Sequence, residues 1–309
     1  MKIAILGAGA LGSVIGAFLT RANCDVQLWD INQEHLDAIG AKGLIFDGPE
    51  GSEIIELSAL KPKDATQAPD LIILLTKTIH TASALSDVAR FTQDGCPVLT
   101  LQNGIGNAES VAQFLAADQV LYGCTMMPGR MIAPGHVATQ GKGAAVFRGL
   151  TEKAQDVANL LQVETDGFRM DRSSETDRMI WQKAAFNCAM NASAALTGAR
   201  VGQLADSEGM KPLLHAISAE VISLANAQNI GAQHEAVKAQ IERALAQHTE
   251  HKPSMLQDIE AGRDTEIESL CGEVARQAMT LGVDAPLNTA LAALIRQKTA
   301  QTNGGQILD

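Results

Sequence analysis

The sequence of 309 residues predicts an α/β domain with a parallel sheet, followed by an all-α domain. In the first half, short and continuous apolar runs alternate with helical patterns, which is typical of a parallel sheet covered on both faces. After about residue 172, strand-like runs stop and long helical patterns follow. We therefore expect a first domain at residues 1–170 and a second domain at residues 171–309.

The order of elements follows from these patterns. Strands are predicted at residues 2–6, 25–29, 70–75, 97–101 and 120–125, with helices at residues 11–21, 81–90 and 109–115. Two glycine-rich segments, 129–135 and 141–149, are expected to form turns that close an antiparallel addition to the sheet. Glycine and proline breakers separate the later helices, predicted at residues 178–196, 210–228, 234–247, 254–281 and 288–298. The polar tail, residues 302–309, is expected to be loosely ordered.

A glycine-rich turn connects the first predicted strand to the first helix, with the sequence Gly7-Ala8-Gly9-Ala10-Leu11-Gly12. The first glycine permits the tight turn, the second lets the backbone approach a pyrophosphate, and the third allows close packing of helix on strand. The pyrophosphate would lie at the helix N-terminus. The pattern predicts a Rossmann-type dinucleotide-binding domain whose cofactor-binding residues include Gly7, Gly9, Ala10, Leu11 and Gly12.

Polar residues follow three of the predicted strands. Asp30 ends the second strand, where an acid binds the ribose 2′-hydroxyl, and no Arg or Lys follows it to bind a 2′-phosphate. This favours NAD over NADP, with capping of the next turn as the alternative role of Asp30. Lys77 and Asn103 follow two further strands, where ligands bind in open α/β sheets, so we expect them to contact cofactor or substrate. The alternative for Asn103 is a structural turn.

One helix of the second half carries Lys183, Asn187 and Asn191 at intervals of four residues, and therefore on one face. Its other residues are mostly apolar, so these groups need partners or a ligand. The alternative is a solvated polar stripe. Further along the chain, Ser254 could cap a helix and Glu266 could be a surface acid. Their spacing alone does not pair them.

Composition excludes several classes of partner. The formal charge of −11 and an aromatic content of 3% argue against nucleic acid and anionic membranes. Five scattered cysteines and no long apolar span indicate a cytoplasmic protein without disulfides. No metal site is expected, because His248 and His251 lack a third ligand near them in the sequence. Cys188, next to the polar face, is expected to be inert and buried.

From Met1 to about Lys298, the chain resembles the ketopantoate reductase (2-dehydropantoate 2-reductase) family. The resemblance is carried by the glycine-rich turn, Leu75-Thr76-Lys77, Gln102-Asn103-Gly104, the helix with Trp181, Lys183, Asn187 and Asn191, and two later motifs, Pro253-Ser254-Met255-Leu256-Gln257-Asp258 and Thr265-Glu266-Ile267.

The resemblance implies reduction of a 2-oxo acid, 2-dehydropantoate, to the 2-hydroxy acid pantoate in pantothenate biosynthesis. It implies that Lys183 is the general acid, with Glu266 beside it, and that Lys77 lies near the nicotinamide ribose. It also implies a set of substrate-binding residues, namely Asn103, Asn187, Asn191 and Ser254. The family is typically NADPH-dependent, with an Arg where this chain has Ile31.

Other functions remain open at this point. The first is an NAD-dependent D-2-hydroxyacid dehydrogenase on the same fold with a different small 2-oxo acid, as in D-mandelate dehydrogenases. The second is a non-catalytic dinucleotide-binding redox sensor, which would not need the lysine, amide and carboxylate residues together. The long apolar helices make a homodimer plausible, and the few aromatic residues favour a small aliphatic substrate.

Overall fold

The computed structural model describes residues 1–159 and 161–302, so the predicted loose tail lies mostly outside the described residues. The chain divides into two compact units, each treated separately below. Unit 1 comprises Met1–Gln102 and Asn107–Thr176. Unit 2 comprises Asn103–Gly106 and Asp177–Asp309, so a short loop from the first half of the chain belongs with the helices of the second. The functional division at residue 170 stays a prediction.

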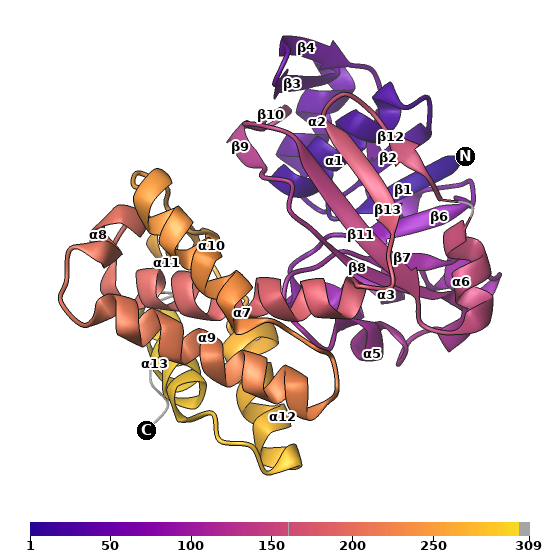
Figure 1. The fold of residues 1–309 in the computed structure, drawn as a ribbon. Helices are drawn as coiled ribbons and strands as arrows, with labels where there is room; N and C mark the ends of the chain where they lie inside the picture. Colours follow the sequence, from indigo (N-terminus) through magenta and orange to yellow (C-terminus); the bar gives the residue numbers. More distant parts are fainter. Residues whose placement is uncertain (160, 303–309) are drawn as a thin grey trace. The chain divides into compact units, whose positions relative to one another are not determined.

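Unit 1 is built on a large mixed sheet (Figure 1). In the described residues, the order of its strands is β12-β13-β11-β8-β7-β6-β1-β2-β5. Neighbouring strands from β5 to β8 are parallel, and β11 runs antiparallel to β8. The strands are β1 (Lys2–Leu6), β2 (Asp25–Trp29), β5 (Ser58–Leu60), β6 (Leu71–Leu74), β7 (Val98–Thr100), β8 (Val120–Thr125), β11 (Gly143–Gly149), β12 (Val163–Glu164) and β13 (Phe168–Arg172).

Both faces of this sheet are buried, which explains the continuous apolar strands. In β1, Ile3 and Ile5 pack in one core with helix α1 (Ala10–Arg21). Ala4 and Leu6 pack in a second core with α3 (Thr81–Asp87), α4 (Ala89–Gln93) and α5 (Asn107–Val111). Because successive strand residues point to opposite faces, a strand covered on both faces must be apolar throughout. The predicted α/β fold of the first half is confirmed.

A second, smaller sheet with the order β4-β3-β10-β9 completes unit 1. Its strands are β3 (Leu44–Gly48), β4 (Gly51–Ile55), β9 (Arg130–Ala133) and β10 (His136–Ala138). The remaining helical elements are α2 (Gln33–Lys42), α6 (Glu152–Asn159), η1 (Pro62–Asp64), η2 (Thr78–His80) and η3 (Ala117–Gln119). The prediction of turns at 129–135 and 141–149 is wrong in part, because β9 and β11 lie there. In β11, alternate residues Ala145 and Phe147 are fully buried, so the strand is held by packing as well as by pairing.

Unit 2 is helical around its own apolar core, which confirms the predicted all-α second half. The described elements are α7 (Thr176–Thr197), α8 (Val201–Ala205), α9 (Met210–Ala227), α10 (His234–Gln247), α11 (Ser254–Glu260), η4 (Glu268–Gly272), α12 (Glu273–Leu281) and α13 (Pro286–Thr302). The single helix predicted over 254–281 is wrong. The chain leaves the helix after α11, where Gly262 has a positive φ of 61°, and re-enters it through a π-turn with non-helical Leu270.

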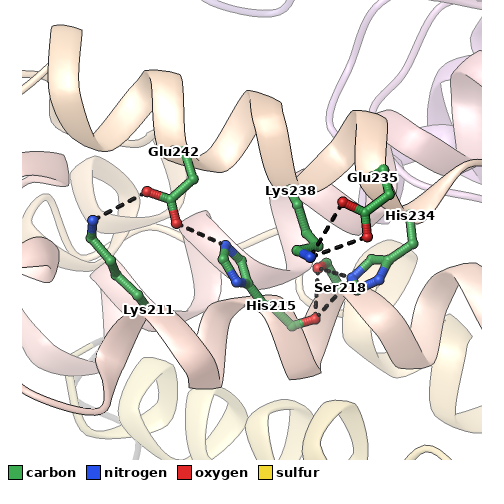
Figure 2. A network of polar contacts seen from close by, with 7 residues as sticks. All are labelled: Lys211, His215, Ser218, His234, Glu235, Lys238 and Glu242. Carbon is green, nitrogen blue, oxygen red and sulfur yellow. Dashed lines mark hydrogen bonds and ion pairs between the residues drawn. The ribbon is translucent and has the colours of Figure 1, made fainter.

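Helices α9 and α10 are joined by a network of polar contacts (Figure 2). Glu242 of α10 pairs with Lys211 and with His215 Nε2, each over 3.1 Å. Ser218 and His234 Nε2 lie 3.3 Å apart. The three α9 residues are spaced so that they share one face, which fixes the register of the helix pair. Within the described residues, no helix has the length and apolar character needed to cross a membrane.

Candidate active site

The glycine-rich turn between β1 and α1 has the geometry that a dinucleotide loop requires. Gly7 has φ 102°, and a Cβ there would lie 2.4 Å from the backbone nitrogen of Thr76. A Cβ on Gly12 would lie 2.1 Å from the carbonyl oxygen of Gly7, so the helix packs directly on the turn. A Cβ on Gly9, by contrast, would meet open space. The N-terminus of α1, with Ala10 and Leu11, therefore opens toward space that a phosphate can fill.

A cavity of about 330 Å³ adjoins this turn within unit 1. It is lined by Gly7 and Gly9, by Asp30 and Ile31 after β2, and by Lys77 after β6. The carboxylate of Asp30 also accepts the backbone N–H of Asn32 over 2.9 Å, so Asp30 caps the turn as well as facing the cavity. Both roles considered for Asp30 are thus compatible. The residues present fit a nicotinamide dinucleotide: a glycine turn, an open helix N-terminus and an acid after β2.

Several cavity residues were not identified from the sequence. His80, Ser83 and Asp87, from η2 and α3, line the same cavity. The signal that could have found them is their position just after β6, since ligands bind beyond the carboxyl ends of parallel strands. Gln102 is a supporting residue of this region: its buried amide donates to the carbonyl oxygen of Thr76 over 2.9 Å. This bond holds the backbone that follows β6.

Unit 2 brings Lys183, Asn103 and Glu266 together. Lys183 Nζ donates to Oδ1 of Asn103 over 2.7 Å, and Nδ2 of Asn103 donates to Oε2 of Glu266 over 3.1 Å. The amide thus links the ammonium to the carboxylate. All three side chains are partly buried, where such hydrogen bonds are stronger than in water. The pairing of Lys183 with Asn103 could not be read from spacing.

The loop Asn103–Gly106 is held against the segment that follows Glu266. Ile105 donates its backbone N–H to the carbonyl oxygen of Ser269 over 3.0 Å. Gly104 has φ 101°, and a Cβ there would lie 2.2 Å from the same oxygen, so only glycine fits. Ser269 in turn donates to the carbonyl oxygen of Glu266 over 3.1 Å. These contacts explain how residues so distant in sequence come together.

The other predicted site residues of unit 2 lie on two elements. Asn187 and Asn191 share the α7 face of Lys183, with Asn187 only 9% exposed. Ser254 is exposed at the first residue of α11. Cys188 is fully buried, and burial raises the pKa of its thiol well above the ordinary value. In the described residues, no group of three or more His, Cys, Asp or Glu could hold a metal ion.

A glycine-rich dinucleotide turn on a parallel sheet, with a lysine held by an amide in a separate helical unit, defines the class of dinucleotide-dependent oxidoreductases. The sequence pattern described as Ketopantoate reductase PanE/ApbA matches residues 3–152, and that described as its C terminal part matches residues 175–299. The chain belongs to the ketopantoate reductase family, as the resemblance had indicated.

Individual relatives cover almost the whole chain. The 2-dehydropantoate 2-reductase of Streptococcus pyogenes serotype M6 is 30% identical over 308 residues, covering 98% of this chain and 99% of that protein. The 2-dehydropantoate 2-reductase of Pyrococcus abyssi is 32% identical, covering 97% of this chain and 98% of that protein. These relatives are oxidoreductases, and the chain is an enzyme of that kind.

Solved structures show the same fold. A D-mandelate dehydrogenase with NADH and anilino(oxo)acetate has a TM-score of 0.91 at 28% identity, covering 98% of this chain and all of that chain. A PanE/ApbA family ketopantoate reductase from Ralstonia eutropha has a TM-score of 0.86 at 30% identity, covering 98% of this chain and 99% of that chain. The structural likeness extends over both units.

Proposed function

We propose that this chain is a 2-dehydropantoate 2-reductase, which reduces a 2-oxo acid to the 2-hydroxy acid pantoate in pantothenate biosynthesis. The observation that carries the proposal is the hydrogen bond of Lys183 to Asn103, in a chain of the ketopantoate reductase family. A redox sensor would need the dinucleotide cavity but no positioned ammonium. The curated relatives favour the reductase over a dehydrogenase for a different acid.

Lys183 is proposed to be the proton donor. When bound, the reduced nicotinamide supplies a hydride to the ketone carbon of the substrate. The carbonyl oxygen then gains negative charge, and the Lys183 ammonium stabilises this charge and transfers its proton to form the hydroxyl. Asn103 holds the ammonium through one N–H, and Glu266 holds the amide of Asn103 in the matching orientation. The neutral amine of Lys183 is then reprotonated by a proton from solvent.

Neutral polar residues are proposed to bind the substrate. Asn187 and Asn191 lie on the α7 face of Lys183, and their amides can donate to a carboxylate and accept from a hydroxyl. Ser254 is proposed to complete this set with its hydroxyl. Amides and a hydroxyl provide these hydrogen bonds without adding a charge, which leaves the Lys183 ammonium as the group that attracts the substrate anion.

The cofactor is proposed to be NADH, bound by the cavity of unit 1. The glycine turn and the α1 N-terminus, at Gly7, Gly9, Ala10, Leu11 and Gly12, would receive the pyrophosphate. Asp30 is proposed to bind the ribose 2′-hydroxyl, and Lys77 to lie near the nicotinamide ribose. Two carboxylates, Asp30 and Asp87, face the cavity and would repel a 2′-phosphate. Ile31 offers such a phosphate no compensating cation.

A homodimer and a cytoplasmic location, both expected from the sequence, stay predictions. All five cysteines are free, and four of them are buried, which is compatible with a reducing compartment.

A substrate panel tests the proposed function. Initial rates of oxidation of NADH and NADPH would be measured with 2-dehydropantoate and with aliphatic and aromatic 2-oxo acids. We expect the largest kcat/KM for 2-dehydropantoate with NADH. A preference for an aromatic acid would instead identify a different 2-hydroxyacid dehydrogenase, and cofactor binding without turnover on any acid would support the sensor.

A further inference from the structure

A continuous chain of hydrogen bonds runs through the interior of unit 1 to the glycine-rich turn. The backbone N–H of Gly135 donates to His35 Nδ1 over 2.9 Å. His35 Nε2 lies 3.1 Å from Ser13 Oγ, and this hydroxyl donates to the carbonyl oxygen of Ala8 over 2.9 Å. His35 is 2% exposed and Ser13 is fully buried. A buried polar chain of this kind is retained only when each member is satisfied.

The direction of every bond in the chain is fixed. Because the N–H of Gly135 donates to Nδ1, this nitrogen carries no proton, and the imidazole proton lies on Nε2. The hydroxyl of Ser13 gives its one hydrogen to Ala8, so it accepts from His35. The neutral Nε2–H form of His35 is therefore the form that completes the chain.

The far end of the chain is firmly held. Gly135 lies between β9 and β10 with φ 72°, and a Cβ there would lie 2.8 Å from the Cβ of Ala38 in α2. Its carbonyl oxygen accepts the backbone N–H of Ile45 in β3 over 2.9 Å. The donor that fixes the imidazole of His35 is thus itself fixed by packing and by the second sheet.

The near end of the chain controls one peptide plane of the dinucleotide turn. The carbonyl oxygen of Ala8 and the N–H of Gly9 belong to the same planar, trans peptide group, and they point in opposite directions. Ser13 holds the oxygen on the interior side. The N–H of Gly9 then points away from the interior. At the Gly9 φ of −65°, the N–H and a Cβ would lie on the same side of the Cα, and a Cβ there would meet open space.

We propose that His35 is a positioning residue for the dinucleotide: through Ser13 it orients the Gly9 N–H toward the cofactor's pyrophosphate and so sets cofactor affinity. The inference rests on the proposed function of the unit 1 cavity. It assigns a role to helix α2, because His35 of this helix acts on the cofactor site through Ser13 and not by contact with the cofactor itself. It also makes the β9–β10 turn part of the support of the cofactor site.

Cofactor titration of three variants tests the inference, with NADH as the probe. Ser13→Ala removes one hydroxyl and is compatible with a helix, and His35→Leu removes the imidazole. We expect each to raise the Kd for NADH about tenfold, as loss of a hydrogen bond that orients a ligand donor does. The Kd for NADH of the double variant should be about equal to the higher Kd of the two single variants, because both substitutions break the same chain of hydrogen bonds. The KM for 2-dehydropantoate at saturating NADH should stay unchanged.

His136→Gln is the matched control. His136 follows Gly135 directly and pairs with Asp47 over 2.8 Å, but this contact does not lead to the glycine turn. Its Kd for NADH should equal that of the wild type. Unchanged affinity in Ser13→Ala, or additive losses in the double variant, would overturn the inference while leaving the proposed function intact. A wild-type protein that binds neither NADH nor NADPH would overturn both.

Discussion

Lys183 Nζ lies 2.7 Å from the amide oxygen of Asn103, although 80 residues separate the two in sequence. The same amide reaches Glu266 with its nitrogen, so its orientation is fixed at both ends. An ammonium held in this way loses little conformational freedom when a substrate binds. Asn103 therefore positions the ammonium of Lys183, a role that sequence motifs alone do not define.

Replacing Asn103 should therefore impair chemistry more than folding. Asn103→Ala removes the link between Lys183 and Glu266, and we expect kcat to fall about 10- to 100-fold through loss of the oriented ammonium. Asn103→Asp should also raise the KM for the 2-oxo acid, because a second carboxylate would repel the substrate anion. Steady-state kinetics at saturating cofactor measure both effects. A kcat of Asn103→Ala within about twofold of the wild type would remove Asn103 from the proposed site.

Cofactor choice should depend on the two residues that follow β2. In Asp30→Ser/Ile31→Arg, a repelling carboxylate is lost and a guanidinium that can pair with a 2′-phosphate is gained. We expect the ratio of kcat/KM for NADH to that for NADPH to fall about 100-fold. Asp94→Asn, at the end of α4 and outside the cavity lining, removes the same charge and should leave the ratio unchanged. If the ratio of kcat/KM for NADH to that for NADPH were the same in Asp30→Ser/Ile31→Arg as in Asp94→Asn, the proposed role of Asp30 in cofactor choice would be refuted.

The N-terminus of α13 depends on one carboxylate. Glu220 of α9 accepts the backbone N–H groups of Leu287 and Asn288, both over 2.9 Å. We expect Glu220→Gln to lower the free energy of unfolding by about 1–3 kcal/mol, since it loses charge at a helix N-terminus and one acceptor. Urea unfolding measures this. Glu235→Gln, which breaks an exposed pair with Lys238, should cost less than about 0.5 kcal/mol. An equal loss of unfolding free energy in Glu220→Gln and Glu235→Gln would contradict the role of Glu220 as the cap of α13.

Stability should fall in mildly acidic solution because of His35. Burial lowers its pKa, against smaller opposing effects of Asp30 and the Ala8 carbonyl. Below about pH 6.5 the unfolded chain gains a proton on this histidine before the folded chain does. The folded state therefore loses stability as the pH falls, by at most about 1.4 kcal/mol per pH unit. Urea unfolding of wild type and His35→Gln between about pH 7 and pH 5 measures the difference. A wild-type curve no steeper than that of the variant would refute the prediction.

The sequence predicts the parts of the fold that depend on local pattern. The apolar run of β6, with Ile72 and Ile73 fully buried, identifies a central strand because both of its faces are covered. Strand β11 was missed, since its glycine-rich ends resemble turns and its pairing with β8 and β13 is non-local. The sequence analysis does not predict the break after α11, because apolar residues at helical spacing return at Ile267 and Leu270 beyond the polar residues 263–266.

The candidate site shows the same limit. Spacing predicts that Lys183, Asn187 and Asn191 share a face, and the position after β7 singles out Asn103. The contact between them depends on Gly104 and Ile105 docking on Ser269, which is a tertiary fit without a sequence period. The roles of Ser254 and Glu266 came from the family resemblance and could not be obtained from spacing.

The kcat of Lys183→Ala tests the central claim most directly. It is measured at saturating NADH and 2-dehydropantoate, with Lys238→Ala as the control, because Lys238 lies in α10 and pairs with Glu235 over 3.1 Å. We expect a loss of at least about 100-fold for Lys183→Ala, with the Kd for NADH unchanged, and full activity for the control. A kcat within about tenfold of the wild type would contradict the role of Lys183 as the proton donor.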